Sequence, residues 1–111
     1  MSGQTISVLR FESFSKRARK LFTEAEIEAL AAYLAQYPAK GDVIPGTGGL
    51  RKLRWSLAGR GKRGGSRVIY YYHRPESLVL LLSAYAKSQQ EDMDAAEKKA
   101  LKAAIEQYFK E

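Results

Sequence analysis

The sequence predicts a single α+β domain, residues 1–111, in which helices cover a small, mostly antiparallel sheet of about four strands. Three observations support this fold class. Apolar and polar residues alternate from Leu50 to Leu57, which is typical of a strand with one buried face. Two helix-capping patterns each precede apolar residues at helical spacing. The run from Leu78 to Ala84 is apolar on both faces, as a central strand would be.

The first half of the chain is expected to form one strand and two helices. Residues alternate over Thr5–Phe11, which predicts the first strand, and a short basic helix follows over Phe14–Phe22. Thr23 with Glu26 three residues later forms a capping box that starts the second helix. The residues predicted to be buried on this helix are Ile27, Leu30, Ala31 and Leu34. Pro38 and the glycine-rich stretch 41–49 predict its end and a loop.

The second half is expected to form three strands joined by hairpins and a final helix. After the strand at Leu50–Leu57, a glycine-rich turn leads into a strand at Arg67–Tyr72, and another turn leads into the central strand. Asp94 with Glu97 three residues later caps the last helix. The predicted buried residues of this helix are Leu101, Ala104, Ile105 and Tyr108.

Composition limits the class of protein. The hydrophobic content of 45% supports a folded core, and the absence of cysteine excludes disulfides and cysteine-based metal sites or catalysis. The N-terminus does not resemble a signal peptide, and the longest apolar run is too short to span a bilayer. We therefore expect a soluble cytoplasmic protein without membrane contact.

Charge is distributed unevenly. The formal net charge is +7, yet no acidic residue lies between Asp42 and Glu76. Eight of the 19 basic residues lie in this stretch, so the excess charge belongs to one segment. A cationic patch of this kind indicates a surface for nucleic-acid phosphates, although a solvated loop that only aids solubility is an alternative.

Two groups of cations stand out within this segment. Arg60, Lys62 and Arg63 lie in the glycine-rich turn, where they can contact phosphates, although the glycines alone would also suit a turn with positive φ angles. Lys52 and Arg54 are two residues apart on one strand and must share a face. Arg67 on the next strand, and Lys87 beside Tyr85 after the central strand, are expected to join them. The alternative is a solvated sheet face, but such faces usually mix Lys with Glu.

The residue types restrict the possible chemistry. His73 is the only histidine, which excludes a nuclease with two catalytic histidines. A catalytic magnesium site needs clustered carboxylates, and the central region supplies only Asp42. The remaining option is cleavage by the 2′-hydroxyl of RNA without metal or other cofactor. Lysine and arginine would then transfer protons and stabilise the charge that develops on the phosphate.

Two blocks, GDVIPGTGGLRKLR at 41–54 and GKRGGSRVIYY at 61–71, strongly resemble the HigB branch of the RelE superfamily of toxins. The resemblance extends more weakly over nearly the whole chain. It implies a RelE-like fold and the toxin half of a toxin–antitoxin pair, which cleaves mRNA on the ribosome without metal. It also implies contacts with ribosomal RNA and an antitoxin partner of helix-turn-helix type.

The resemblance also assigns roles to individual residues. The residues that match the catalytic positions of the family are Lys52, Arg54, Arg67 and Lys87. Together with the charge pattern, it suggests RNA contacts for Arg51, Arg60, Lys62, Arg63 and Tyr85. Tyr85 could stack on a base, act as an acid or belong to the core. Which residue is acid and which is base stays open, and so do two other functions: a non-catalytic RNA-binding module and an inactive relative that acts only through a protein partner.

Overall fold

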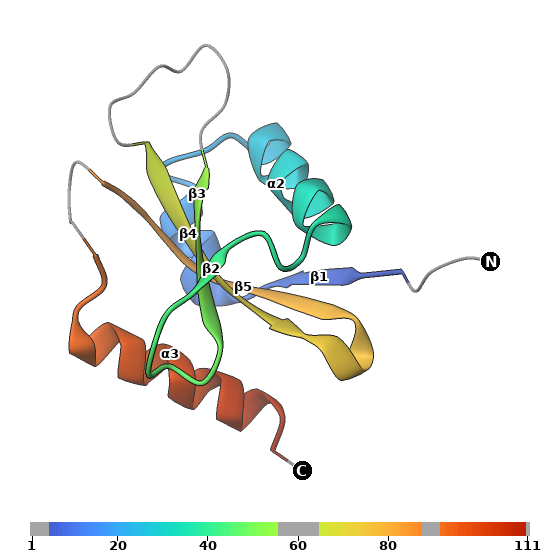
Figure 1. Ribbon diagram of the computed structural model, residues 1–111. Helices are drawn as coiled ribbons and strands as arrows, with labels where there is room; N and C mark the ends of the chain where they lie inside the picture. The colour runs from blue at the N-terminus through green and yellow to red at the C-terminus, as the bar shows by residue number, and fades with distance from the viewer. Residues whose placement is uncertain (1–4, 56–64, 88–91, 111) are drawn as a thin grey trace.

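The computed structural model of the protein describes residues 5–55, 65–87 and 92–110, and it consists of one five-stranded mixed sheet with helices on both faces (Figure 1). In spatial order the strands are β1 (Ser7–Arg10), β5 (Leu78–Ala86), β4 (Ser66–His73), β3 (Leu50–Trp55) and β2 (Asp42–Val43). The helices are α1 (Glu12–Ala18), α2 (Glu24–Gln36), α3 (Ala95–Tyr108) and the 3₁₀ turn η1 (Arg74–Glu76). The α+β class predicted from the sequence is confirmed.

The sheet is antiparallel except at one edge. β2, β3, β4 and β5 pair antiparallel in succession, whereas β1 runs parallel to β5. β5 therefore lies between β1 and β4, and its residues from Leu78 to Tyr85 are buried, as the apolar run predicted. The strand β2 is an addition to the expected four, because its two residues lie in the stretch 41–49 that was predicted as loop.

Two hydrophobic clusters cover the two faces of this sheet. On one face α1 and α2 pack through Phe14, Leu30 and Leu34 against residues that include Val68 and Val79. On the other face α3 packs against a second cluster (Figure 1). Members of this second cluster are Leu50, Ile69, Leu80, Leu82, Met93 and Leu101. We call this second side the α3 face.

The capping patterns located both long helices correctly. The Thr23 and Asp94 side chains each accept a hydrogen bond from the third backbone N–H of their helix, and the Glu at that position bonds back. The first helix was predicted over Phe14–Phe22, whereas α1 begins at Glu12 and ends at Ala18. Tyr108 was predicted to be buried and is 45% exposed, whereas the next residue, Phe109, packs against the second cluster. No helix in the described part of the chain has the length and hydropathy to cross a bilayer.

A buried tyrosine joins the sheet to the loop after α2. The Tyr70 hydroxyl accepts a hydrogen bond from the Gly41 N–H at 2.8 Å and donates one to the Pro38 carbonyl at 2.8 Å. A methyl group on Gly41 would lie 2.8 Å from Cε1 of Tyr70, so this close approach requires glycine. The contact holds the start of β2 against β4.

We predict that Tyr70→Phe destabilises the fold by about 1–3 kcal/mol, because it leaves a buried N–H and a carbonyl without their partner. Chemical denaturation should show the loss as a lower midpoint with an unchanged slope. Tyr71→Phe, on the neighbouring half-buried ring, is the control and should change stability by less than about 0.5 kcal/mol. Equal losses in the two variants would contradict the role given to the Tyr70 hydroxyl.

Candidate nucleic-acid interface

The register of three strands brings the predicted cations together. In the β3–β4 pair Arg54 lies opposite Arg67, and Lys52 lies opposite Ile69. In the β4–β5 pair Arg67 lies opposite Tyr85. Since Ile69 and Tyr85 belong to the cluster under α3, the three cations share the α3 face. We call Lys52, Arg54, Arg67 and Tyr85 the cationic row.

Members of the row differ in exposure. Arg54 is exposed and Lys52 is half-buried, whereas Arg67 is only 8% exposed. Like charges directly opposite each other on a sheet repel, and a bound anion would relieve the repulsion between Arg54 and Arg67. The spacing of Lys52 and Arg54 predicted that they share one face of the sheet, and the register confirms this.

Tyr85 is a hydrogen-bond donor in this row. Burial raises the pKa of Tyr85 to about 12, a nearby carboxylate adds to the effect, and Arg67 opposes it. The hydroxyl is therefore protonated at neutral pH. Tyr85 is 4% exposed and belongs to the apolar cluster under α3, so it has a core role, while its hydroxyl donates to the Asp92 carboxylate.

Sequence reasoning missed one residue of the site, Asp92. Its Oδ1 atom lies 3.4 Å from Nζ of Lys52 and 3.3 Å from the hydroxyl of Tyr85, and it accepts the Met93 N–H at 2.8 Å. Partial burial opposes ionisation, but the Met93 N–H and Lys52 outweigh it, and the pKa of Asp92 falls below its ordinary value. The position of Asp92 just before a capping box was visible in the sequence, but its contact with Lys52 was not.

Lys87 extends the ladder beyond the last residue of β5. Its backbone N–H donates to the Gly65 carbonyl at 3.0 Å, one step past the pairing of Ser66 with Ala86. Lys87 follows Tyr85 by two residues and is half-buried. The backbone thus carries Lys87 to the end of the row. The predicted anchors Arg60, Lys62 and Arg63 lie outside the described residues.

Arg51 lies on the other side of the sheet. Its partner in the ladder is Tyr70, which belongs to the core under α2. The guanidinium donates to the carbonyl of Gly41 at 2.7 Å and to that of Ala39 at 3.2 Å. Arg51 therefore supports the loop after α2, and the RNA contact expected for it stays a prediction.

His73 lies at the opposite end of β4 from Arg67, where its ring stacks on Phe109 with 4.1 Å between centroids. The only histidine of the sequence therefore lies away from Arg67 and the end of the sheet that carries it. The described residues also contain no group of three side chains suited to hold a metal ion.

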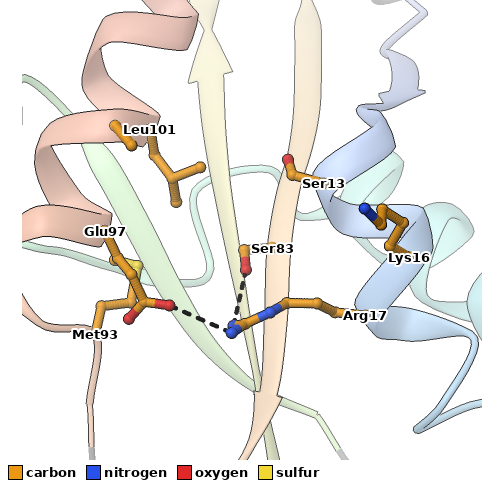
Figure 2. Close-up of a pocket in the computed structure, with 8 residues that line it drawn as sticks. Ser13, Lys16, Arg17, Ser83, Met93, Glu97 and Leu101 are labelled. Carbon is orange, nitrogen blue, oxygen red and sulfur yellow. Dashed lines mark hydrogen bonds and ion pairs between the residues drawn. The ribbon is translucent and has the colours of Figure 1, made fainter.

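A pocket of about 300 Å³ lies beside the row, between α1, β5 and α3 (Figure 2). Arg17 from α1 reaches across it, with 3.3 Å to Oε2 of Glu97 and 3.4 Å to the hydroxyl of Ser83. The same guanidinium donates to the Ala84 carbonyl, which lies beyond the part of β5 that pairs with β1. The ion pair of Arg17 with Glu97 therefore joins α1 to α3.

Comparisons with known proteins identify the family and the fold of this chain. A family model described as the RelE toxin of the RelE/RelB toxin–antitoxin system matches residues 6–111. Among solved structures, the free form of an E. coli RelE double arginine-to-alanine mutant is 15% identical, with a TM-score of 0.58, and the match covers 92% of this chain and 98% of that one. The same mutant bound to an antitoxin RelBc peptide is 17% identical, with a TM-score of 0.52 and coverage of 87% and 93%. The isolated E. coli RelE toxin is 14% identical, with a TM-score of 0.51 and coverage of 89% and 98%.

We predict that Arg51→Ala lowers the free energy of unfolding by about 0.5–1.5 kcal/mol, because two loop carbonyls lose their donor. The matched variant Arg54→Ala removes the same charge from an exposed position and should leave stability within about 0.5 kcal/mol. Thermal or urea unfolding of the two variants measures the difference. If Arg54→Ala proved the more damaging, the assignment of structural and binding roles would be reversed.

Proposed function

This chain belongs to the RelE family of toxins from toxin–antitoxin systems, and from that premise we propose that it is an endoribonuclease that cleaves mRNA on the ribosome. We further propose that it lies in the HigB branch of the superfamily, on the two sequence blocks at 41–54 and 61–71. The reaction would be attack of a ribose 2′-hydroxyl on the adjacent phosphate, without metal.

The observation that carries this proposal is the cationic row. Arg67 lies opposite both Arg54 and Tyr85, and Lys52 is two residues from Arg54 on the same face. A phosphodiester placed here would meet three cations and a hydroxyl donor. Positive groups fixed around a phosphate stabilise the extra negative charge of the transition state, which is the largest contribution that this kind of site can make.

Roles can be divided by chemistry. Arginine keeps its charge at any physiological pH, so Arg67 and Arg54 suit stabilisation of the pentacovalent phosphate. Lys52 and Lys87 can exchange a proton and are the candidates for acid and base. The tip cations Arg60, Lys62 and Arg63 are proposed as anchors that bind the phosphate backbone without taking part in the reaction.

Partners follow from the family. The related E. coli toxin forms a complex with an antitoxin peptide, and we propose an antitoxin for this chain, of helix-turn-helix type. The messenger would be presented by the ribosome, with additional contacts to ribosomal RNA, in the cytoplasm.

We predict that production of this protein alone arrests growth and leads to cleavage within the coding region of translated messages. Primer extension on one message with and without its start codon tests the role of the ribosome. Cleavage should disappear when the start codon is removed. Equal cleavage of both messages would remove the ribosome from the proposal, and no cleavage of either would favour a non-catalytic RNA-binding module or an inactive relative.

We predict that Lys52→Ala lowers the saturated single-turnover rate on programmed ribosomes about a hundredfold or more, because it removes a cation of the row that is also a candidate acid or base. Lys99→Ala, an exposed change on α3, is the control and should leave the rate unchanged. Arg63→Ala should instead raise the half-saturating toxin concentration and leave the saturated rate nearly intact. If Lys52→Ala shifted only that concentration, the row would be a binding surface and not a catalytic one.

We predict that cleavage on preformed ribosome complexes survives EDTA, with single-turnover rates within a few-fold. The described residues supply no carboxylate cluster of the kind that a catalytic magnesium site uses. Adding magnesium back after chelation controls for loss of ribosome integrity. A strict requirement of the chemical step for magnesium would contradict the 2′-hydroxyl mechanism.

A further inference from the structure

Asp92 places one carboxylate oxygen between two donors of the cationic row. Oδ1 lies 3.4 Å from the Lys52 ammonium and 3.3 Å from the Tyr85 hydroxyl. Lys52 and Tyr85 come from β3 and β5, with β4 between them, so the two donors converge across a strand. Two donors that converge on one negatively charged oxygen can bind an oxygen of a carboxylate or an oxygen of a phosphate.

The contacts of Asp92 with these donors are long. Charge-assisted hydrogen bonds are usually about 2.7–2.9 Å, and both distances here exceed that range. The Asp92 side chain is 47% exposed and the Lys52 side chain 33% exposed, so solvent screens the ion pair. Exposed pairs of this kind contribute little to stability. The attraction between Asp92 and Lys52 is therefore weak.

A phosphate and the Asp92 carboxylate cannot share these donors. Two negative groups that compete for the same donors also repel each other. The carboxylate lies outside α3, two residues before the N-cap Asp94, so its side chain can rotate without moving the helix. Its 2.8 Å hydrogen bond from the Met93 N–H is local to this segment.

We infer that Lys52 and Tyr85 form a phosphate-oxygen site that Asp92 occupies in the free protein, and that RNA phosphate binds by displacing this carboxylate. The inference rests on the proposed function for the identity of the phosphate. It gives Tyr85 a role that neither charge nor spacing assigned, as the neutral donor beside Lys52. It also makes Asp92 a competitor that reduces the affinity of the free protein for RNA.

Asp92→Asn tests this directly, because the amide keeps the shape and one acceptor oxygen but removes the charge. Titration with inorganic phosphate, followed by NMR at Lys52, Arg67 and Tyr85, should give an apparent Kd about two- to fivefold lower than in the unsubstituted protein, the range expected for an exposed ion pair. On programmed ribosomes, the half-saturating concentration should fall by the same factor, with the saturated rate within about threefold.

Asp94→Asn is the matched control, because it makes the same charge change two residues away and asparagine is an equally good N-cap. It should leave the phosphate Kd nearly unchanged. The gain from Asp92→Asn should also vanish in a Lys52→Met background, since the competing pair no longer exists there.

Several results would overturn the inference. These are an unchanged phosphate Kd in Asp92→Asn, an equal gain from Asp94→Asn, or no phosphate-dependent shifts at the row. A hundredfold fall in the saturated rate of Asp92→Asn would mean that the carboxylate takes part in the reaction rather than competing with the substrate. The phosphate titration needs no cleavage, so it decides this inference even if the protein proves not to cut messenger RNA.

Discussion

The cross-strand register of β3 and β4 is the constraint on which the site depends. Side chains alternate between the two faces of a strand, so a shift of one residue would move Lys52 and Arg54 into the core under α2 and bring Leu53 to the face of α3. Leu53 is 8% exposed in the observed register. Burial of the apolar face thus fixes where the cations lie.

Two contacts on the far side of the sheet support this register. The Tyr70 hydroxyl and the Arg51 guanidinium both bind the loop after α2, at Gly41 among other groups. Gly41 is followed at once by β2, which pairs with β3 along Lys52 and Arg51. Side chains on the α2 side therefore hold the backbone that presents cations on the α3 side. Arg51 supports the strand that carries the cationic row, because its guanidinium binds two carbonyls of the loop after α2.

A row of cations on a sheet face requires compensation in the free protein. Arg67 is almost fully buried and faces Arg54 on one side and Tyr85 on the other. Asp92 supplies negative charge to this group through Lys52 and the Tyr85 hydroxyl. A carboxylate in this position offsets a small part of the repulsion among the cations. In the proposed reaction, cations fixed in place before binding would stabilise the transition state.

Much of this arrangement could be predicted from local sequence, and the rest depends on distant contacts. Alternation placed Lys52 and Arg54 on one face, and the capping boxes located α2 and α3. Asp92 could not be assigned, because it meets Lys52 forty residues away in the chain and only folding shows that contact. The short strand β2 escaped detection because it lies in a stretch rich in glycine and proline, where its pairing with β3 outweighs local preference.

The chemical form of the cleaved ends tests the central claim most directly. If the cationic row promotes attack by the 2′-hydroxyl, mass spectrometry of the upstream fragment should find a 2′,3′-cyclic phosphate, and the downstream fragment should begin with a free 5′-hydroxyl. A messenger with a single 2′-deoxy nucleotide at the cleavage position should resist cleavage while binding normally. Upstream fragments that end in a 3′-hydroxyl, or cleavage of the 2′-deoxy messenger at the normal rate, would contradict the mechanism.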